Sequence, residues 1–214
     1  MLPMFADRRD AGRALAASVG EVVPSPVTVI GVARGGVPVA AEVATALGAP
    51  LEAMVVRKVG HPRQPELALG AVTSDGTFTP SGVEAPEVPP DVLDDLIAVA
   101  VDDAVAMERR LRGDGAARDL AGERVVLVDD GVATGASLRA GVRSARARGA
   151  AVVVVAAPVA TPGAVDVLAR DADEVICVGI SDALMAVGQA YREFDAVSED
   201  EVVALLATAG RAAA

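Results

Sequence analysis

The chain is poor in aromatic residues and in cysteine, and both scarcities limit what it can be. Aromatic side chains make up 2% of the 214 residues while hydrophobic residues make up 52%, so the core has to be packed from valine, alanine and leucine. Such a composition suits a buried parallel sheet covered by helices. Cys177 is the only cysteine and lies in an apolar run, which excludes a disulfide framework and indicates a buried small hydrophobe.

Positive charge and long apolar stretches are also scarce. The formal net charge is -11 at pH 7, and Lys58 is the only lysine. A chain without a broad basic face is a poor partner for nucleic acid or for an anionic membrane. No run approaches the roughly 18 apolar residues of a membrane span, and the first residues lack the pattern of an export signal. We therefore expect a cytoplasmic protein that binds any anionic ligand at a local site.

The hydrophobic periodicity alternates between strands and helices and predicts one α/β domain, 1–214. The expected architecture is a Rossmann-like parallel sheet with right-handed crossovers, flanked by helices. Prolines and turn dipeptides break the pattern between 57 and 90, where we expect loops or a short hairpin and the greatest mobility. The predicted strands are 27–32, 51–56, 125–128, 151–156 and 174–178, and the predicted helices are 7–19, 37–47, 91–112, 136–148 and 162–170.

The segment 125–137 combines features that together describe one ligand. A buried strand ends at Asp129 and Asp130, whose carboxylates can accept hydrogen bonds from the two neighbouring hydroxyls of a ribose. Glycines then let the backbone curl around a ligand, and the first turn of a helix offers free amides to a phosphate. The segment therefore predicts a ribose 5-phosphate cradle whose phosphate is held by Gly131, Ala133, Thr134, Gly135, Ala136 and Ser137.

Three alternatives explain this region less well. Either half of the cradle alone would suit solvated strand-end acids followed by an ordinary helix cap at Thr134 or Ser137. A nucleoside-triphosphate site needs a glycine loop that ends in Lys-Ser or Lys-Thr, and the single lysine does not stand in one. A dinucleotide site needs Gly-x-Gly-x-x-Gly after the first strand, which the segment 31–36 does not supply.

The segment 125–137 resembles the phosphoribosyl-diphosphate motif of the type I phosphoribosyltransferases: an apolar strand, two acids, a small residue and Thr-Gly-x-Thr/Ser. The segments 33–36, 56–60, 66–72 and 187–194 are similar to a bacterial branch of phosphoribosyltransferase-domain proteins. The resemblance implies that fold, with a core at about 20–180, an insertion with a flexible flap at about 57–120 and a small C-terminal hood at about 181–214.

The resemblance also implies a function. It predicts an enzyme that transfers the phosphoribosyl group of 5-phosphoribosyl 1-diphosphate (PRPP) to a nitrogen nucleophile, a nucleobase above all, and releases diphosphate. Mg²⁺ is the expected cofactor, and Asp129 and Asp130 are the candidate residues for contact with it, directly or indirectly. A homodimer is a compatible assembly.

Two further elements are candidates for the leaving diphosphate. Arg34, Gly35 and Gly36 follow the first strand, where backbone amides and a guanidinium can hold it, although a helix-entry turn with a surface arginine would look the same. In the family a diphosphate loop stands here and often contains a strained or cis peptide. Arg57 and Lys58 follow the second strand, as a local positive site or as a solvated charge run. Arg34 and Lys58 are the predicted catalytic residues.

The acceptor site is expected in the hood. Asp182, Tyr191 and Phe194 follow the last strand, and a flat base could stack on the two rings, or the rings could simply pack against a C-terminal helix. The resemblance makes the segment 66–72 the flap that shields the reaction from water. His61 is a lone loop histidine, more often incidental than catalytic.

The resemblance limits the acceptor but does not name it. Relatives that use 6-oxopurines carry an Asp where this chain has Ala133, which disfavours hypoxanthine and guanine. Relatives that use adenine or uracil can carry alanine there. The alternative function is a regulator that senses PRPP without turning it over; such relatives carry an added DNA-binding segment or a basic face, and neither is visible.

Overall fold

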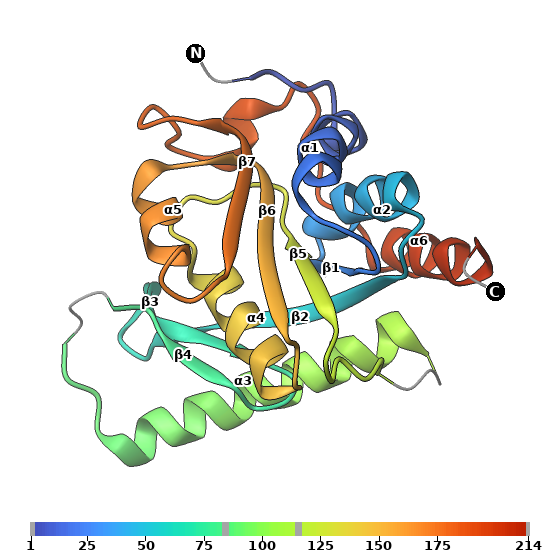
Figure 1. Cartoon of the computed structure of the whole chain (residues 1–214). Helices are drawn as coiled ribbons and strands as arrows, with labels where there is room; N and C mark the ends of the chain where they lie inside the picture. Colours follow the sequence, from blue (N-terminus) through green and yellow to red (C-terminus); the bar gives the residue numbers. More distant parts are fainter. Residues whose placement is uncertain (1–2, 83–85, 114–116, 213–214) are drawn as a thin grey trace.

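The structure is a computed structural model that describes residues 3–82, 86–113 and 117–212. One mixed sheet runs through it in the order β4-β3-β2-β1-β5-β6-β7 (Figure 1). Its strands are β1 (Thr28–Ala33), β2 (Leu51–His61), β3 (Gln64–Thr73), β4 (Phe78–Pro80), β5 (Arg124–Val128), β6 (Val152–Ala160) and β7 (Glu174–Ile180). The helices are α1 (Arg8–Val22), α2 (Gly36–Leu47), α3 (Pro90–Arg112), α4 (Ala136–Ala147), α5 (Pro162–Leu168), the 3-10 helix η1 (Val187–Ala190) and α6 (Glu199–Ala212).

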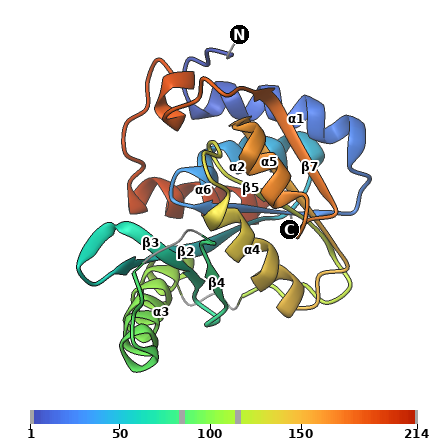
Figure 2. The same ribbon diagram turned by 90° about the vertical axis from the view of Figure 1, so that its left-hand side faces the viewer.

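Helices cover both faces of the sheet, which leaves its central strands buried. Helices α1 and α2 pack on one face with α6 beside them, and α4 and α5 pack on the other (Figure 2). Strand β6 shows the consequence, because eight of its nine residues are buried in a nearly continuous run of Val and Ala. Such runs are typical of parallel strands with both faces covered. The aromatic-poor core predicted from composition is the core that the structure has.

The expected parallel sheet is confirmed for β2, β1, β5, β6 and β7, which pair in parallel. Between 57 and 90 the expected hairpin is confirmed, but the strands are longer than a short hairpin and the expected loops are wrong for most of the segment. Strand β2 continues to His61, and β3 and β4 pair antiparallel beside it. The residues that we expected to interrupt strands stand where a hairpin tolerates them. Pro62 lies in the turn after β2, Pro65 lies near the outer end of β3, and the Asp75-Gly76 pair turns the chain toward β4.

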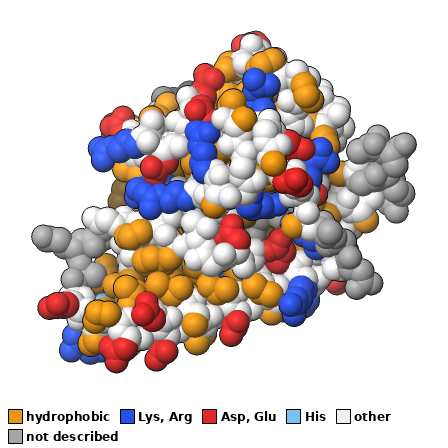
Figure 3. Space-filling model, turned by 60° about the horizontal axis from the view of Figure 1, so that its bottom comes forward, with side chains coloured by type: hydrophobic (Ala, Val, Ile, Leu, Met, Phe, Trp, Pro, Cys, Tyr) orange, Lys and Arg blue, Asp and Glu red, His pale blue; other side chains and the backbone are white. Residues whose placement is uncertain are grey.

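Helix α3 closes the core of this antiparallel extension. Its side chains Leu93, Leu96 and Ile97 pack against Val59 and Val72 of the strands. Hydrophobic side chains also gather on the outer surface, in the lower part of Figure 3, among acidic ones, and Val99 is 63% exposed. Within the described residues, no helix is both long and apolar enough to cross a membrane.

Candidate functional site

A cleft of about 350 Å³ opens where β1 and β5 end. Parallel neighbours bring their carboxyl ends to the same edge of a sheet, so the loop after β1 meets the acids after β5. The cleft therefore brings together, from separate parts of the sequence, six of the predicted site residues, namely Arg34, Gly35, Asp129, Asp130, Ser137 and Phe194.

The loop after β1 fits tightly against the two acids. A side chain at Gly36 would place its Cβ 2.5 Å from the Val128 carbonyl oxygen and 2.8 Å from Asp129 Cα. A Cβ at Gly35 would collide with the Asp130 carboxylate. The Ala33–Arg34 peptide is cis, as the family resemblance led us to expect. The two glycines are thus explained by contact with β5 as well as by room for a ligand.

The two acids occupy an electrostatically costly position. Burial, and then the charge of Asp130, raise the pKa of Asp129 well above its ordinary value. Burial also raises the pKa of Asp130, against the lowering effect of a hydrogen bond and charge from Arg8. The Asp130 amide donates to Asp129 Oδ1 over 2.9 Å. Carboxylates held this way would gain from a ligand that offers them hydroxyl donors.

Arg8 is a site residue that sequence reasoning missed. Its Nε donates to Asp130 Oδ2 over 2.8 Å, and its Nη1 donates to the Asp195 carbonyl oxygen over 2.7 Å. The guanidinium carbon lies 3.9 Å from the ring centroid of Phe194. No motif spacing could reveal a partner 122 residues away in the sequence, and only the packing of α1 beside the sheet brings it there.

The predicted phosphate end has the expected helix start. Gly135 has φ of 78°, a conformation that favours glycine, and α4 begins at the next residue. The Arg139 amide donates to the Gly135 carbonyl over 2.9 Å. The amides before Arg139, in the first turn of α4, come ahead of the helix's own backbone hydrogen bonds and can therefore bind an anion. Position 131 requires glycine for a different reason, because a Cβ there would collide with the Val187 side chain.

The side chains of the cradle differ in exposure. Thr134 is exposed and available to a ligand, while Ser137 is partly buried and lines the cleft. Ala133 is exposed too, and its carbonyl accepts a hydrogen bond from Thr161 Oγ1 over 2.8 Å. The cradle between β5 and α4 thus keeps its surface side open.

Strand alternation separates Arg57 from Lys58. Val56 lines the cleft, whereas Arg57 points to the other face, where its Nη2 lies 2.7 Å from Met107 Sδ. Lys58 shares the face of Val56 and is exposed, but it is not among the residues that line the cleft. Neither residue therefore lines the cleft, and Lys58 differs from Arg57 in lying on the same face of β2 as Val56, which does. His61 is buried, and its Nδ1 accepts a hydrogen bond from the Arg63 amide in the turn of the hairpin.

The hood is built from both ends of the chain. The Phe5 amide donates to the Ala190 carbonyl over 2.8 Å, and the Arg192 amide donates to the Phe5 carbonyl over 2.9 Å. Tyr191 is buried against Phe5, and its hydroxyl donates to the Asp130 carbonyl over 2.5 Å. Its ring stacks on that of Phe194 with 4.9 Å between centroids.

This arrangement assigns different parts to the three hood residues. Tyr191 supports the strand end, and only 6% of it is exposed. Phe194 lines the cleft and is 36% exposed, so of the two rings it is the one that borders the cleft, with the Arg8 guanidinium over it. Asp182 lies in an exposed turn and is not among the residues that line the cleft.

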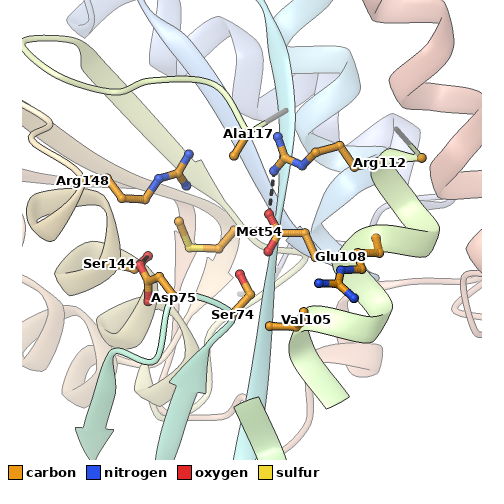
Figure 4. A pocket seen from close by; sticks show the side chains of 11 residues that line it. Met54, Ser74, Asp75, Val105, Glu108, Arg112, Ala117, Ser144 and Arg148 are labelled. Atoms are coloured by element: carbon orange, nitrogen blue, oxygen red, sulfur yellow. Dashed lines mark hydrogen bonds and ion pairs between the residues drawn. The ribbon is translucent and has the colours of Figure 1, made fainter. Parts of the chain in front are cut away.

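A second cleft, of about 270 Å³, lies between α3, α4 and the β3–β4 turn. Arg112 and Arg148 face it, and Arg112 is paired with Glu108 (Figure 4). Arg112 is also paired with Glu52 of β2. Asp75 accepts hydrogen bonds from Ser144 and Thr73 there. These pairs link α3 to β2 and the β3–β4 turn to α4, which gives this cleft a structural explanation.

The fold and the site define a class of protein before any comparison is made. Five parallel strands between helices, with acids and a glycine loop at the carboxyl edge, characterise an α/β protein with a Rossmann-like core. Residues 8–189 match the family described as the phosphoribosyl transferase domain. The chain belongs to this family and has the type I phosphoribosyltransferase fold.

Individual relatives agree with this assignment. The protein named "Putative phosphoribosyl transferase Rv0571c" from Mycobacterium tuberculosis is 43% identical over 98% of this chain, but the chain spans only 48% of that relative's length. The crystal structure of TT1426 from Thermus thermophilus is 40% identical, with a TM-score of 0.81 over 95% of this chain and 97% of that one. A purine phosphoribosyltransferase from Pyrococcus horikoshii, 21% identical over 89% of this chain and 92% of that one with a TM-score of 0.50, shares the fold.

Proposed function

We propose that this protein transfers the phosphoribosyl group of PRPP to a nitrogen nucleophile and releases diphosphate. The observation that carries the proposal is the convergence, in one cleft, of two strand-end acids, a glycine loop with Arg34 and the first turn of α4. These groups suit the ribose hydroxyls, the diphosphate and the 5-phosphate respectively. Because the chain spans about half of its curated relatives, the proposal concerns the part of the protein given by this sequence.

The chain's own residues would act mainly by positioning and by charge. Displacement at C1 of the ribose passes through a transition state in which the sugar is cationic and the diphosphate has gained charge. Asp129 and Asp130 would hold the ribose hydroxyls and orient C1 toward the acceptor. Arg34, with Lys58 two residues beyond Val56 on the same face of β2, would stabilise the departing diphosphate.

The residues present also fit a magnesium ion that comes with its ligands. Among the described residues, no group of three or more His, Cys, Asp or Glu gathers as a metal site, so the chain offers only the two acids of the cleft. Mg²⁺ commonly keeps several waters and takes one or two carboxylates together with substrate phosphates. Asp129 and Asp130 would contact it directly or through water, and when bound it would neutralise charge on the diphosphate.

The proposed flap is the outer part of the β2–β3 hairpin, which includes 66–69 of the segment predicted as the flap, 66–72, while 70–72 are buried. The hairpin starts beside Val56, which lines the cleft, and its turn reaches the edge of the molecule (Figure 2). The outer residues of β3 are exposed or partly exposed, while its last four are buried and anchored. A hairpin anchored at one end can close over bound substrate and keep water from the anomeric carbon.

The acceptor would approach from the side of Phe194, which is the ring that lines the cleft. Ala133 disfavours 6-oxopurines there, because the residue that serves N7 in such relatives is missing. A planar nitrogen heterocycle other than a 6-oxopurine is therefore the proposed acceptor class.

A diphosphate-release assay with Mg²⁺, PRPP and a panel of bases tests the proposal. Release that depends on one base, and that is lost in Asp129→Asn, is the expected result. Saturable PRPP binding without release on any base would instead favour a PRPP sensor. Failure to bind PRPP at all would overturn both functions.

A further inference from the structure

Arg8 occupies the place where the ligand of this cleft would bind. Its Nε donates a hydrogen bond to Asp130 Oδ2, which in the proposed function would accept from a ribose hydroxyl. Its guanidinium lies 3.9 Å over the Phe194 ring, the surface proposed for the acceptor. A planar cation thus covers both the sugar end and the base end of the cleft.

A second position for the same side chain lies next to this one. A small acidic cleft of about 180 Å³ adjoins the first, and Arg8, Ala196 and Val197 line both. Its four carboxylates come from Asp7, Glu193, Asp195 and Glu201, and besides Arg8 it holds one cation, Arg9, so its lining keeps an excess of negative charge. The guanidinium already points partly that way, since Nη1 donates to the Asp195 carbonyl oxygen over 2.7 Å.

The backbone that carries Arg8 is fixed, so only the side chain has to turn. Asp7 caps α1 through Oδ1, which accepts from the Asp10 amide over 2.7 Å. Asp10 in turn accepts from the Ala6 amide over 3.0 Å. A capped first turn holds the main chain, while an arginine side chain has several rotatable bonds.

We propose that Arg8 is an internal competitor of the donor, which leaves Asp130 and turns into the acidic cleft when PRPP binds. This inference rests on the proposed function and adds a regulation of its site. PRPP has to displace Arg8 from Asp130 before it can bind. Donor binding is therefore weaker than it would be if Asp130 had no partner in the free protein. The displacement also removes a cation from the reaction centre, where it would oppose the positive charge that develops on the sugar.

Donor affinity in variants of Arg8 tests the inference. We expect Arg8→Gln to bind PRPP with Mg²⁺ roughly tenfold more tightly than the natural chain, equivalent to about 1.4 kcal/mol. Arg8→Lys should fall between the two, because a lysine keeps the charge but cannot both bond Asp130 and lie flat on Phe194. Arg13→Gln is the matched control, since it removes the same charge from the same helix at an exposed pair with Asp10 and should leave affinity unchanged.

Tyr191 provides a readout that is independent of turnover. It is the only tyrosine, the chain has no tryptophan, and its hydroxyl bonds to Asp130. Its fluorescence can therefore report titrations with PRPP, and with ribose 5-phosphate, which lacks the diphosphate. Circular dichroism and a thermal melt establish that each variant is folded.

A second pair of substitutions tests the destination of the side chain. Glu193→Gln together with Glu201→Gln removes charge from the acidic cleft and should weaken PRPP binding by about two- to fivefold, as expected for exposed charges. In the Arg8→Gln background the same pair should have no effect.

The outcomes separate this inference from the proposed function. Tighter binding in Arg8→Gln, with Arg13→Gln unchanged, supports the competitor. Unchanged or weaker binding in a folded Arg8→Gln, while the natural chain binds PRPP, overturns it and leaves the donor site standing; weaker binding would make Arg8 a ligand of the substrate. If neither the natural chain nor any variant binds PRPP, the proposed function fails and the inference fails with it.

Discussion

Replacement of Asp129 by Asn should make the protein more stable at neutral pH while it disables the donor site. Burial and the neighbouring Asp130 raise the pKa of Asp129 in the folded state above that of the unfolded chain, about 3.9. Between these two pKa values the folded protein holds a proton that the unfolded chain has lost. Stability therefore falls as pH rises through this window, by up to about 1.4 kcal/mol per pH unit.

Asparagine keeps the shape of the side chain and does not titrate. Its carbonyl can still accept the hydrogen bond from the Asp130 amide, which spans 2.9 Å in the natural chain. The free energy of unfolding of Asp129→Asn should therefore exceed that of the natural chain by an amount that grows with pH above about 4. Urea denaturation followed by circular dichroism between pH 4 and 8 measures the difference, provided that the slopes with urea agree.

Asp75 is the matched control, because it is a carboxylate whose pKa is shifted in the direction opposite to that of Asp129. Burial acts to raise its pKa, but hydrogen bonds from Ser144, Thr73 and Thr77 together lower it below its ordinary value. Asp75→Asn should thus lose stability at neutral pH, and the loss should fade as pH falls through the folded pKa. If Asp129→Asn were less stable than the natural chain at pH 7, or showed the same pH dependence, the electrostatic account of the cleft would be wrong.

Three other substitutions test single contacts. Lys58→Ala should lower kcat for diphosphate release more than it weakens PRPP binding, with Arg57→Ala as the control whose guanidinium lies on the opposite face beside Met107; equal kcat in Lys58→Ala would remove this lysine from the mechanism. Gly36→Ala should destabilise the fold by about 1–3 kcal/mol in thermal or urea unfolding, because its Cβ would lie 2.5 Å from a backbone oxygen, and a change below a few tenths would show that the loop adapts. Tyr191→Phe should cost about 1 kcal/mol of stability and weaken PRPP binding through Asp130, whereas unchanged binding would make the Tyr191 hydroxyl purely structural.

The amino-acid sequence alone specified the parallel core and the donor cradle, because both depend on local features. Two acids follow the end of β5 and α4 begins directly after Gly135, so strand, acids and helix start follow within 14 residues, Arg124 to Ser137. The apolar runs of the central strands are continuous because both faces are covered, which makes them visible without any alignment. Chain order and strand direction then place the loop after β1 beside these acids.

Sequence reasoning failed where strand pairing reversed. Prolines and turn dipeptides between 57 and 90 predicted loops or a short hairpin. The hairpin is confirmed, with Pro62 in its turn and Pro65 near the outer end of β3, whereas the loops are wrong over β3 and β4. Arg57 and Lys58 were taken together as neighbours in sequence, whereas the pleat of β2 sends them to opposite faces. A linear pattern of charges carries no information about which face will become the cleft.

The sequence by itself thus determined the fold class, the two acids and the helix start that suit a ribose phosphate, since each follows from residues that are adjacent in the chain. Only the tertiary structure brought Arg8 onto Asp130, buried Tyr191 within the hood and placed Phe194 in the lining of the cleft. These contacts join the first turn of α1 to segments far along the chain. Their partners are chosen by how helices and sheet pack, and that packing is a property of the whole core.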